Sequence, residues 1–247
     1  MSINGGHLIG SYLSRRGVQC VFGISGGHIE SLLDGLQHYN IQTIDVRHEQ
    51  AAVMMAHAMA VYTGKPGVCF LTAGPGFTNG ITGIANACLD NAPVVVLCGR
   101  HPLRDDLKGA LQEMNQIDVV KPLVKWCTTC YDTRRIPEYL DMAFRYALCG
   151  RPGPVFLELP PDILNVAVED FESFSGVSQT GLILGDGWWY TLDKSQENIK
   201  PLWDESLIRS YSGRVGCVSG GCARTSDHLG FLIGLWDTDY NLSSLDT

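Results

Sequence analysis

Basic residues are scarce in this sequence: 18 Lys and Arg stand against 26 Asp and Glu, which gives a net charge of −8. Proteins that bind a phosphate backbone usually present a basic face, so this balance argues against a nucleic-acid partner. No run reaches the ~18 consecutive apolar residues of a membrane-spanning helix, so no membrane segment is expected. The N-terminus also lacks a basic start followed by an apolar core, and we therefore expect a cytoplasmic protein without a secretory signal.

Nucleotide-binding motifs are absent as well. No G-x-G-x-x-G closes the first predicted strand and no G-x-x-x-x-G-K-[ST] occurs, so a nucleotide-binding or dinucleotide-binding domain lacks support. The nine cysteines are scattered through apolar segments, which is typical of small buried side chains in a reducing compartment. Cys127 and Cys130 form a C-x-x-C, but positions three apart in a strand face opposite sides, so no metal site is predicted.

Up to about residue 168 the sequence alternates between short apolar runs and segments of helical period. The apolar runs lack clean polar alternation, which is typical of strands buried on both faces. This order predicts an α/β fold: a doubly wound, mostly parallel six-stranded sheet with helices on both faces. The predicted strands are 18–23, 41–46, 67–73, 93–99, 123–130 and 154–159, and the predicted helices are 7–16, 29–38, 49–62, 79–89 and 136–148.

The sequence changes character after residue 169. Short apolar bursts without a sustained period replace the alternation, and the remaining length is too short for a second full α/β domain. We therefore expect one domain over 1–170 and an irregular C-terminal tail over 171–247, with partial disorder of the tail as an alternative.

Glu49 is the first candidate for chemistry, because it follows a predicted strand and opens a predicted helix. An acidic residue in a first turn is ordinarily stabilised by the helix dipole, which is the simpler interpretation. The run A-A-V-M-M that follows makes this helix apolar, so the acid is expected to be shielded from solvent. A shielded carboxylate beside a backbone-lined slot can steer the protons of a bound heterocycle.

A glycine-rich turn between a strand and a helix is the second candidate. Glycine lets the backbone approach a flat ligand closely, and the following helix offers free N–H groups. A tight turn without a ligand is the alternative. Asn79 is expected either to cap that helix or to contact a ligand. The residues of this candidate site are Thr72, Gly74, Pro75, Gly76 and Asn79.

Two further polar residues follow predicted strands. His28, in Ser25-Gly26-Gly27-His28, could exchange a proton with a substrate oxygen, with an ordinary surface-turn histidine as the alternative. Gln112, with Glu113 and Gln116, lies in a polar loop, and such loops at a sheet's carboxyl edge often carry specificity. From the residues alone, this loop is simply solvated.

These features together resemble the N-terminal, pyrimidine-binding domain of thiamine-diphosphate enzymes. The group is the one that holds acetolactate synthase, benzaldehyde lyase and 2-hydroxyacyl-CoA lyase. The resemblance covers residues 1 to about 170 and preserves the family's order and spacing. The matching stretches are VFGISGGHIESLLDGL, R-H-E at 47–49, G-P-G-F-T-N at 74–79 and GRPGPVFLELPPDIL.

The resemblance implies a role for each matching residue. Glu49 looks like the glutamate that hydrogen-bonds N1′ of the cofactor's aminopyrimidine and so promotes loss of the thiazolium C2 proton. Thr72, Gly74, Pro75, Gly76 and Asn79 look like the wall around the pyrimidine. His28 and Gln112 resemble the polar pair that orients the substrate carbonyl and hydroxyl. The implied activity is that of a lyase or carboligase acting on 2-oxo acids, 2-hydroxy ketones or 2-hydroxyacyl-CoA.

The resemblance also implies cofactors and partners. Thiamine diphosphate is expected, with Mg²⁺ held through a diphosphate-binding domain that is not found in this chain. Gly185-Asp186-Gly187 lacks the asparagine pair that follows this motif in the family, so we interpret it as a chance match. Arg151 resembles a position near the flavin of acetolactate synthases, but it suits a structural turn equally well, so FAD is doubtful.

The expected partners are a small-molecule substrate, a second copy in a dimer or larger assembly, and a separate diphosphate-binding subunit. The alternative function is a truncated, catalytically silent module that only dimerises or that needs the separate subunit. The departure of the tail from the family pattern favours this alternative.

Overall fold

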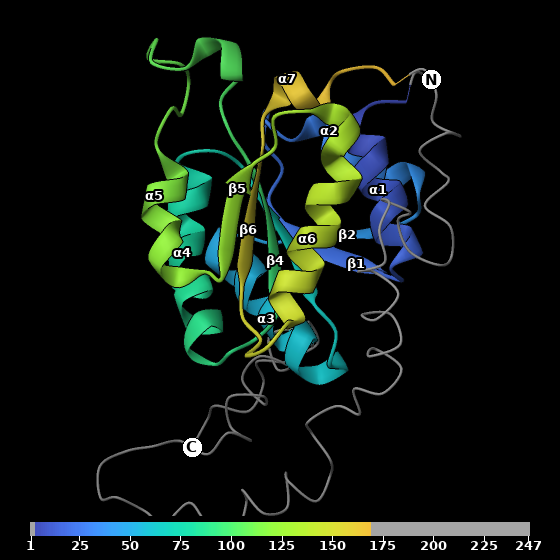
Figure 1. Cartoon of the computed structure of the whole chain (residues 1–247), viewed down its shortest axis with the longest axis vertical. Helices are drawn as coiled ribbons and strands as arrows, with labels where there is room; N and C mark the ends of the chain where they lie inside the picture. Colours follow the sequence, from blue (N-terminus) through green and yellow to red (C-terminus); the bar gives the residue numbers. More distant parts are fainter. Residues whose placement is uncertain (1–2, 169–247) are drawn as a thin grey trace, which may run out of the picture. The chain divides into compact units, whose positions relative to one another are not determined.

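The computed structural model describes residues 3–168 of the chain (Figure 1). Its centre is a six-stranded sheet with the strand order β2-β1-β3-β4-β6-β5. Every pairing between neighbouring strands of this sheet is parallel, so the carboxyl ends of all six strands lie at one edge. The strands are β1 (Cys20–Gly23), β2 (Gln42–Asp45), β3 (Gly67–Leu71), β4 (Val94–Gly99), β5 (Trp126–Thr129) and β6 (Val155–Leu159).

Helices cover both faces of the sheet (Figure 1). On one face α1 packs against α2 and α6, and on the other α3 packs against α4. The helices are α1 (Gly5–Arg15), α2 (Glu30–His38), α3 (Glu49–Thr63), α4 (Pro75–Leu89) and α6 (Ile136–Leu148), with the short α5 (Gln116–Val120) and α7 (Pro161–Leu164). Single 3-10 turns lie at Leu103–Asp105, Lys121–Leu123 and Thr133–Arg135.

The apolar runs of the sequence become strands that are covered on both faces. Every residue of β3, β4 and β6 is buried, whereas β2 at the edge of the sheet is largely exposed. Between the sheet and α3–α4, the rings of Phe77 and Phe156 meet edge to face at 5.3 Å. Burial of this kind supplies most of the favourable free energy of folding, and it holds the strand ends in place.

Glycines bring α1 and α2 into backbone contact. A Cβ added to Gly6 would lie 1.7 Å from the carbonyl oxygen of Ser31, and one added to Gly35 would lie 2.0 Å from the carbonyl oxygen of Gly6. No side chain fits at either position, so the two helices pack at the shortest distance the backbone allows. Because α2 begins directly after the loop that carries His28, this contact supports that loop.

The predicted fold class is confirmed, and the predicted strands and long helices lie close to their expected positions. One helix start is wrong: α4 begins at Pro75 rather than at residue 79, because proline is well suited to the first position of a helix. The tail predicted over 171–247, with Gly185-Asp186-Gly187, lies outside the described residues. Within residues 3–168, no helix combines the length and the apolar character that crossing a membrane requires.

Candidate functional site

The candidate residues come together at the carboxyl edge of the parallel sheet. The strand order reverses between β1 and β3, and open α/β sheets bind ligands at such a point. The loops after these two strands are in contact there, because a Cβ added to Gly26 would lie 2.3 Å from Oγ1 of Thr72. The loop after β4 joins them, since a Cβ on Gly99 would lie 3.0 Å from Cβ of His28 and 3.3 Å from the nitrogen of Ala73.

Glu49 is the first residue of α3, and its carboxylate is shielded as expected. Only 8% of the residue is exposed. The helix is started by His48, whose Nδ1 accepts a hydrogen bond from the N–H of Gln50 at 3.2 Å. The Glu49 Oε2 atom accepts a hydrogen bond from Nδ2 of Asn79 at 3.0 Å. Its Oε1 atom accepts none from the residues that the structure describes, so one oxygen of a nearly buried acid remains available.

The glycine turn faces this carboxylate. Gly74 has φ +60° and ψ −113°, a conformation that only glycine adopts readily. A Cβ on Gly76 would lie 2.5 Å from Cγ2 of Thr72 and 3.2 Å from Oε1 of Glu49. The Oγ1 atom of Thr72 is buried and has no hydrogen-bond partner among the described residues. The turn therefore packs closely against the acid and Thr72, where two oxygen atoms have no hydrogen-bond partner among the described residues.

Asn79 does not cap α4, because the helix already begins at Pro75. Its side chain instead holds Glu49 from the facing helix. The expectation that Asn79 caps the helix is therefore wrong, and a ligand contact by this residue stays a prediction.

His28 lies half-buried on the other side of the Gly99 backbone. It lines an open pocket of about 570 Å³ together with residues of the loop after β4, among them Ala110 and Leu111. Burial lowers the pKa of His28, although a hydrogen bond with the Leu111 backbone opposes this effect. Its Nδ1 atom is buried and has no partner in the described part of the chain. The lowered pKa favours the neutral imidazole, and Nδ1 is available for a further hydrogen bond.

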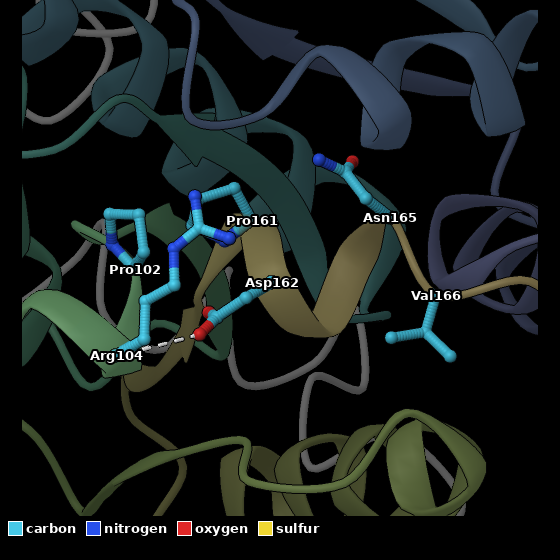
Figure 2. A pocket seen from close by; sticks show the side chains of 6 residues that line it. All are labelled: Pro102, Arg104, Pro161, Asp162, Asn165 and Val166. Atoms are coloured by element: carbon cyan, nitrogen blue, oxygen red, sulfur yellow. Dashed lines mark hydrogen bonds between the residues drawn. The ribbon is translucent and has the colours of Figure 1, made fainter.

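A second, smaller pocket of about 290 Å³ continues along this edge (Figure 2). Pro102 and Pro161 line both pockets. Asp162 accepts hydrogen bonds from the N–H groups of Leu103 at 3.1 Å and Arg104 at 3.3 Å, and so ties α7 to the loop after β4. The two pockets therefore lie next to each other.

Gln112 packs with its backbone against the glycine turn. It has φ +60°, and a Cβ on Gly74 would lie 2.8 Å from Cβ of Gln112. Glu113 shapes this loop, since its carboxylate accepts hydrogen bonds from the N–H groups of Leu107 at 2.6 Å and Ala110 at 2.9 Å. These two bonds lower the pKa of Glu113. The structure thus places Gln112 against Gly74, the first residue of the glycine turn.

The expectation of a solvated loop is wrong for Gln116. This residue is 1% exposed, and its side chain connects Gly74 and Gly99 with Glu158 of β6. Its burial follows from the short helix α5, which turns it towards the sheet. The sequence holds one signal that could have revealed this network: Glu158 is the only charged residue in the apolar run VFLEL. A charge in such a strand requires buried polar partners.

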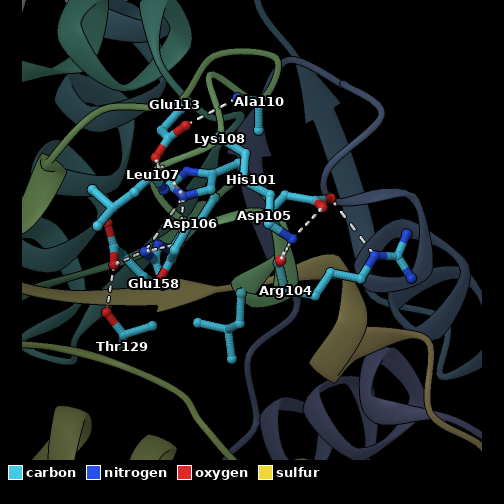
Figure 3. A network of polar contacts seen from close by, with 12 residues as sticks. His101, Arg104, Asp105, Asp106, Leu107, Lys108, Ala110, Glu113, Thr129 and Glu158 are labelled. Carbon is cyan, nitrogen blue, oxygen red and sulfur yellow. Dashed lines mark hydrogen bonds and ion pairs between the residues drawn. The ribbon is translucent and has the colours of Figure 1, made fainter.

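The network extends from Glu158 to the loop after β4 (Figure 3). The Arg100 Nε atom lies 3.7 Å from Glu158, and Arg100 Nη2 donates to Asp106 Oδ1 at 2.7 Å. The His101 Nε2 atom lies 2.6 Å from that same oxygen and 3.8 Å from Glu113. Burial opposes ionisation of Asp106, but hydrogen bonds from His101 and Arg100 lower its pKa.

His101, Asp106 and Glu113 have the residue types of a metal site, and their candidate ligand atoms lie within 4.8 Å of one another. However, the guanidinium of Arg100 already supplies a cation to Asp106, and Glu113 already accepts two backbone N–H groups. We therefore interpret this cluster as a support for the loop.

Comparison with known proteins agrees with this geometry. Residues 3–119 match the family described as "Thiamine pyrophosphate enzyme, N-terminal TPP binding domain". The chain is 41% identical over 161 residues to 2-hydroxyacyl-CoA lyase 2 of Mus musculus, which is 65% of this chain and 26% of that protein. It is 44% identical over 166 residues to the acetolactate synthase isozyme 3 large subunit of Escherichia coli, which is 67% of this chain and 29% of that protein.

A third match extends further along the chain. The acetolactate synthase, chloroplastic, of Arabidopsis thaliana is 33% identical over 233 residues, which is 94% of this chain and 34% of that protein. This alignment therefore runs past residue 170 into the segment predicted as a tail. The chain spans between a quarter and about a third of the length of these three relatives.

Proposed function

Because residues 3–119 of this chain match the N-terminal TPP binding domain of thiamine pyrophosphate enzymes, we propose that the chain supplies the pyrimidine-binding side of a thiamine-diphosphate site. The site would serve a lyase or carboligase acting on 2-oxo acids, 2-hydroxy ketones or 2-hydroxyacyl-CoA. The relatives named acetolactate synthase and 2-hydroxyacyl-CoA lyase 2 support this choice of reactions.

The observation that carries the proposal is the pairing of a nearly buried acid with a glycine turn. Among the described residues, Glu49 has one oxygen without a hydrogen-bond donor, and Gly76 brings the backbone of the turn close to it because no Cβ intervenes. Thr72 adds a buried hydroxyl that has no partner in the same part of the chain. A flat ring with a nitrogen atom at its edge can share a proton with the free oxygen of Glu49, and the aminopyrimidine of thiamine diphosphate is such a ring.

Each residue then has a separate task. When bound, the cofactor supplies an electron sink for bonds next to a carbonyl group. Glu49 accepts and holds a proton at its free oxygen, while Asn79 keeps the carboxylate in place. His28, which lines the neighbouring pocket, and Gln112, which lies against Gly74, hold the substrate's oxygen atoms. Mg²⁺ enters this proposal only through a diphosphate-binding domain, and FAD has no support beyond the resemblance of Arg151.

Ligand titration separates this proposal from the silent module. The full chain is titrated with thiamine diphosphate and Mg²⁺, alone and then mixed with a diphosphate-binding domain of a thiamine-diphosphate enzyme. We expect saturable binding in the mixture that is much weaker for either component alone. If the mixture binds no more cofactor than the added domain does by itself, the silent module is the better account.

We also propose that the chain self-associates. Val61 and Tyr62 at the end of α3 are 54% and 82% exposed, and Leu89 at the end of α4 is 78% exposed. Exposed apolar groups on paired helices favour association. We expect sedimentation to detect a dimer or larger species at micromolar concentration, and Tyr62→Lys to weaken it. Tyr131→Lys, at a residue 63% exposed after β5, is the control. A monomeric wild-type chain would contradict this expectation.

A further inference from the structure

Gln116 makes hydrogen bonds to three parts of the chain that are remote in sequence. Its Oε1 atom accepts from the N–H of Gly74 at 2.9 Å. Its Nε2 atom donates to the carbonyl oxygen of Gly99 at 3.0 Å and to Oε1 of Glu158 at 2.9 Å. The first contact reaches the glycine turn, and the other two reach the ends of β4 and β6. Gln116 therefore links the turn to the sheet.

These partners leave the amide of Gln116 only one orientation. Gly99 and Glu158 offer acceptors and require the NH₂ group, whereas Gly74 offers a donor and requires the oxygen. Glu158 is 2% exposed, and it also accepts a hydrogen bond from the hydroxyl of Thr129. A buried carboxylate is costly without donors, so any rotation of Gln116 would leave Glu158 short of a partner. The side chain of Gln116 is consequently held in one orientation.

The position of the Gly74 peptide depends on Gln116, because no other side chain of the described residues forms a hydrogen bond with Gly74. No side-chain hydrogen bond caps the start of α4, and Gly74 has φ +60°, a conformation that glycine adopts easily. Gly76 follows two residues later and lies against Glu49 and Thr72. The position of the Gly74 peptide therefore sets the width of the space between the turn and the Glu49 carboxylate.

We propose that Gln116 is a positioning residue that holds the Gly74–Gly76 turn at a fixed distance from Glu49, with Glu158 as its anchor. This inference rests on the proposed function, in which that space receives the pyrimidine ring. Gln116 acts through the Gly74 peptide and has no contact with the cofactor of its own. Gln116 thereby connects the Gly74–Gly76 turn with the hydrogen-bond network of Glu158, which extends to the loop that contains Gln112.

The test uses three variants of the full chain. Gln116→Met keeps the length of the side chain but removes its hydrogen bonds to Gly74, Gly99 and Glu158. The double exchange Gln116→Glu with Glu158→Gln keeps an acceptor for Gly74 and a donor–acceptor pair between the two side chains, but it removes the donor to the Gly99 carbonyl. Thr129→Val is the matched control, because it removes a donor to Glu158 and leaves the bond between Gln116 and Gly74 intact.

Amide hydrogen exchange reports the position of the turn without any cofactor. We expect the Gly74 amide of the wild-type chain to exchange far more slowly than that of Gly27, which is exposed in the loop after β1. The Gly74 amide should lose this protection in Gln116→Met and keep it in the double exchange and in Thr129→Val. Rapid exchange of Gly74 in the wild-type chain would overturn the proposal, and this measurement stands even where Gln116→Met fails to fold.

Cofactor binding is measured in the mixture with a diphosphate-binding domain. We expect Gln116→Met to bind thiamine diphosphate at least about tenfold more weakly. A buried polar group that loses its partner costs enough free energy to lower the affinity by about this factor. Thr129→Val should remain near the wild-type affinity, and the double exchange should bind more tightly than Gln116→Met. Equal binding by a folded Gln116→Met would overturn the positioning role. Absence of binding by the wild-type mixture would instead overturn the proposed function, while the exchange of Gly74 would still report on the turn.

Discussion

Glu49→Gln is expected to slow proton exchange at C2 of thiamine diphosphate by about 10²- to 10⁴-fold, the range that a positioned acid–base group contributes. The glutamine has the same shape and can keep its contact with Asn79, but its amide cannot accept a proton as a carboxylate does. The chain is mixed with a diphosphate-binding domain, and the loss of the C2 proton signal in D₂O is followed by NMR at saturating cofactor.

A matched control for this result is Glu30→Gln. Glu30 is also the first residue of a helix at the carboxyl edge of the sheet, but it is exposed. The same change of charge at an equivalent helix position should leave C2 exchange unaltered. Undiminished exchange in Glu49→Gln at saturation would remove the proton-holding role from this residue. A loss of exchange in both variants would indicate that removing a negative charge from any helix start at this edge slows C2 exchange.

Gly76→Ala is expected to weaken thiamine diphosphate binding by about tenfold to a hundredfold. The added Cβ would lie 2.5 Å from Cγ2 of Thr72, so the turn or the threonine must move, and 3.2 Å from Oε1 of Glu49. Forcing a methyl group into a packed position typically costs about 1–3 kcal/mol, and each 1.4 kcal/mol corresponds to a factor of ten in affinity. Calorimetric titration of the mixture with cofactor measures the change.

Gly27→Ala serves as the control for Gly76→Ala. It introduces the same methyl group into a neighbouring loop of the same edge, where no atom lies within 4 Å of the new Cβ. Its affinity for the cofactor should equal that of the wild-type chain. If Gly76→Ala binds as tightly as Gly27→Ala while its melting temperature is unchanged, the space beside Glu49 is not where the ring binds.

The two variants fail in different ways, which makes them informative together. Glu49→Gln keeps the shape of the site and changes its proton chemistry, so binding should persist while exchange is lost. Gly76→Ala keeps the carboxylate and changes the space, so exchange at saturation should be less affected than binding. The opposite pattern would indicate that the acid mainly binds and that the turn mainly tunes the chemistry.

Much of the architecture could be read from local sequence pattern. Apolar runs without polar alternation predicted buried strands, and helical periods between them predicted crossovers, so the parallel sheet followed. Parallel strands place all their carboxyl ends at one edge, and this brought Glu49, Thr72 and His28 to the same region before any coordinates were considered. The start of α4 was misjudged by four residues, since Pro75 belongs to the helix and not to the turn.

The polar contacts that shape the site could not be read in this way. Asn79 and Glu49 are 30 residues apart in sequence, and Gln116 is 42 residues from both Gly74 and Glu158. Periodicity reports which face of an element is apolar, but it carries no information on which side chains meet across elements. Gln116 in a polar loop and Glu158 in an apolar strand become partners only when α5 packs beside the end of β6.

The order of amino acids was therefore sufficient for the α/β class, and it indicated that Glu49, Thr72 and His28 follow strands at one edge of the sheet. Three-dimensional packing was needed to establish that one oxygen of Glu49 has no donor among the described residues, that Gly76 lies close beside it and that Gln116 bonds the Gly74 peptide. The physical reason is the range of the interactions. Burial patterns are encoded residue by residue along each element, whereas hydrogen bonds between elements depend on distances that arise only after the elements have packed.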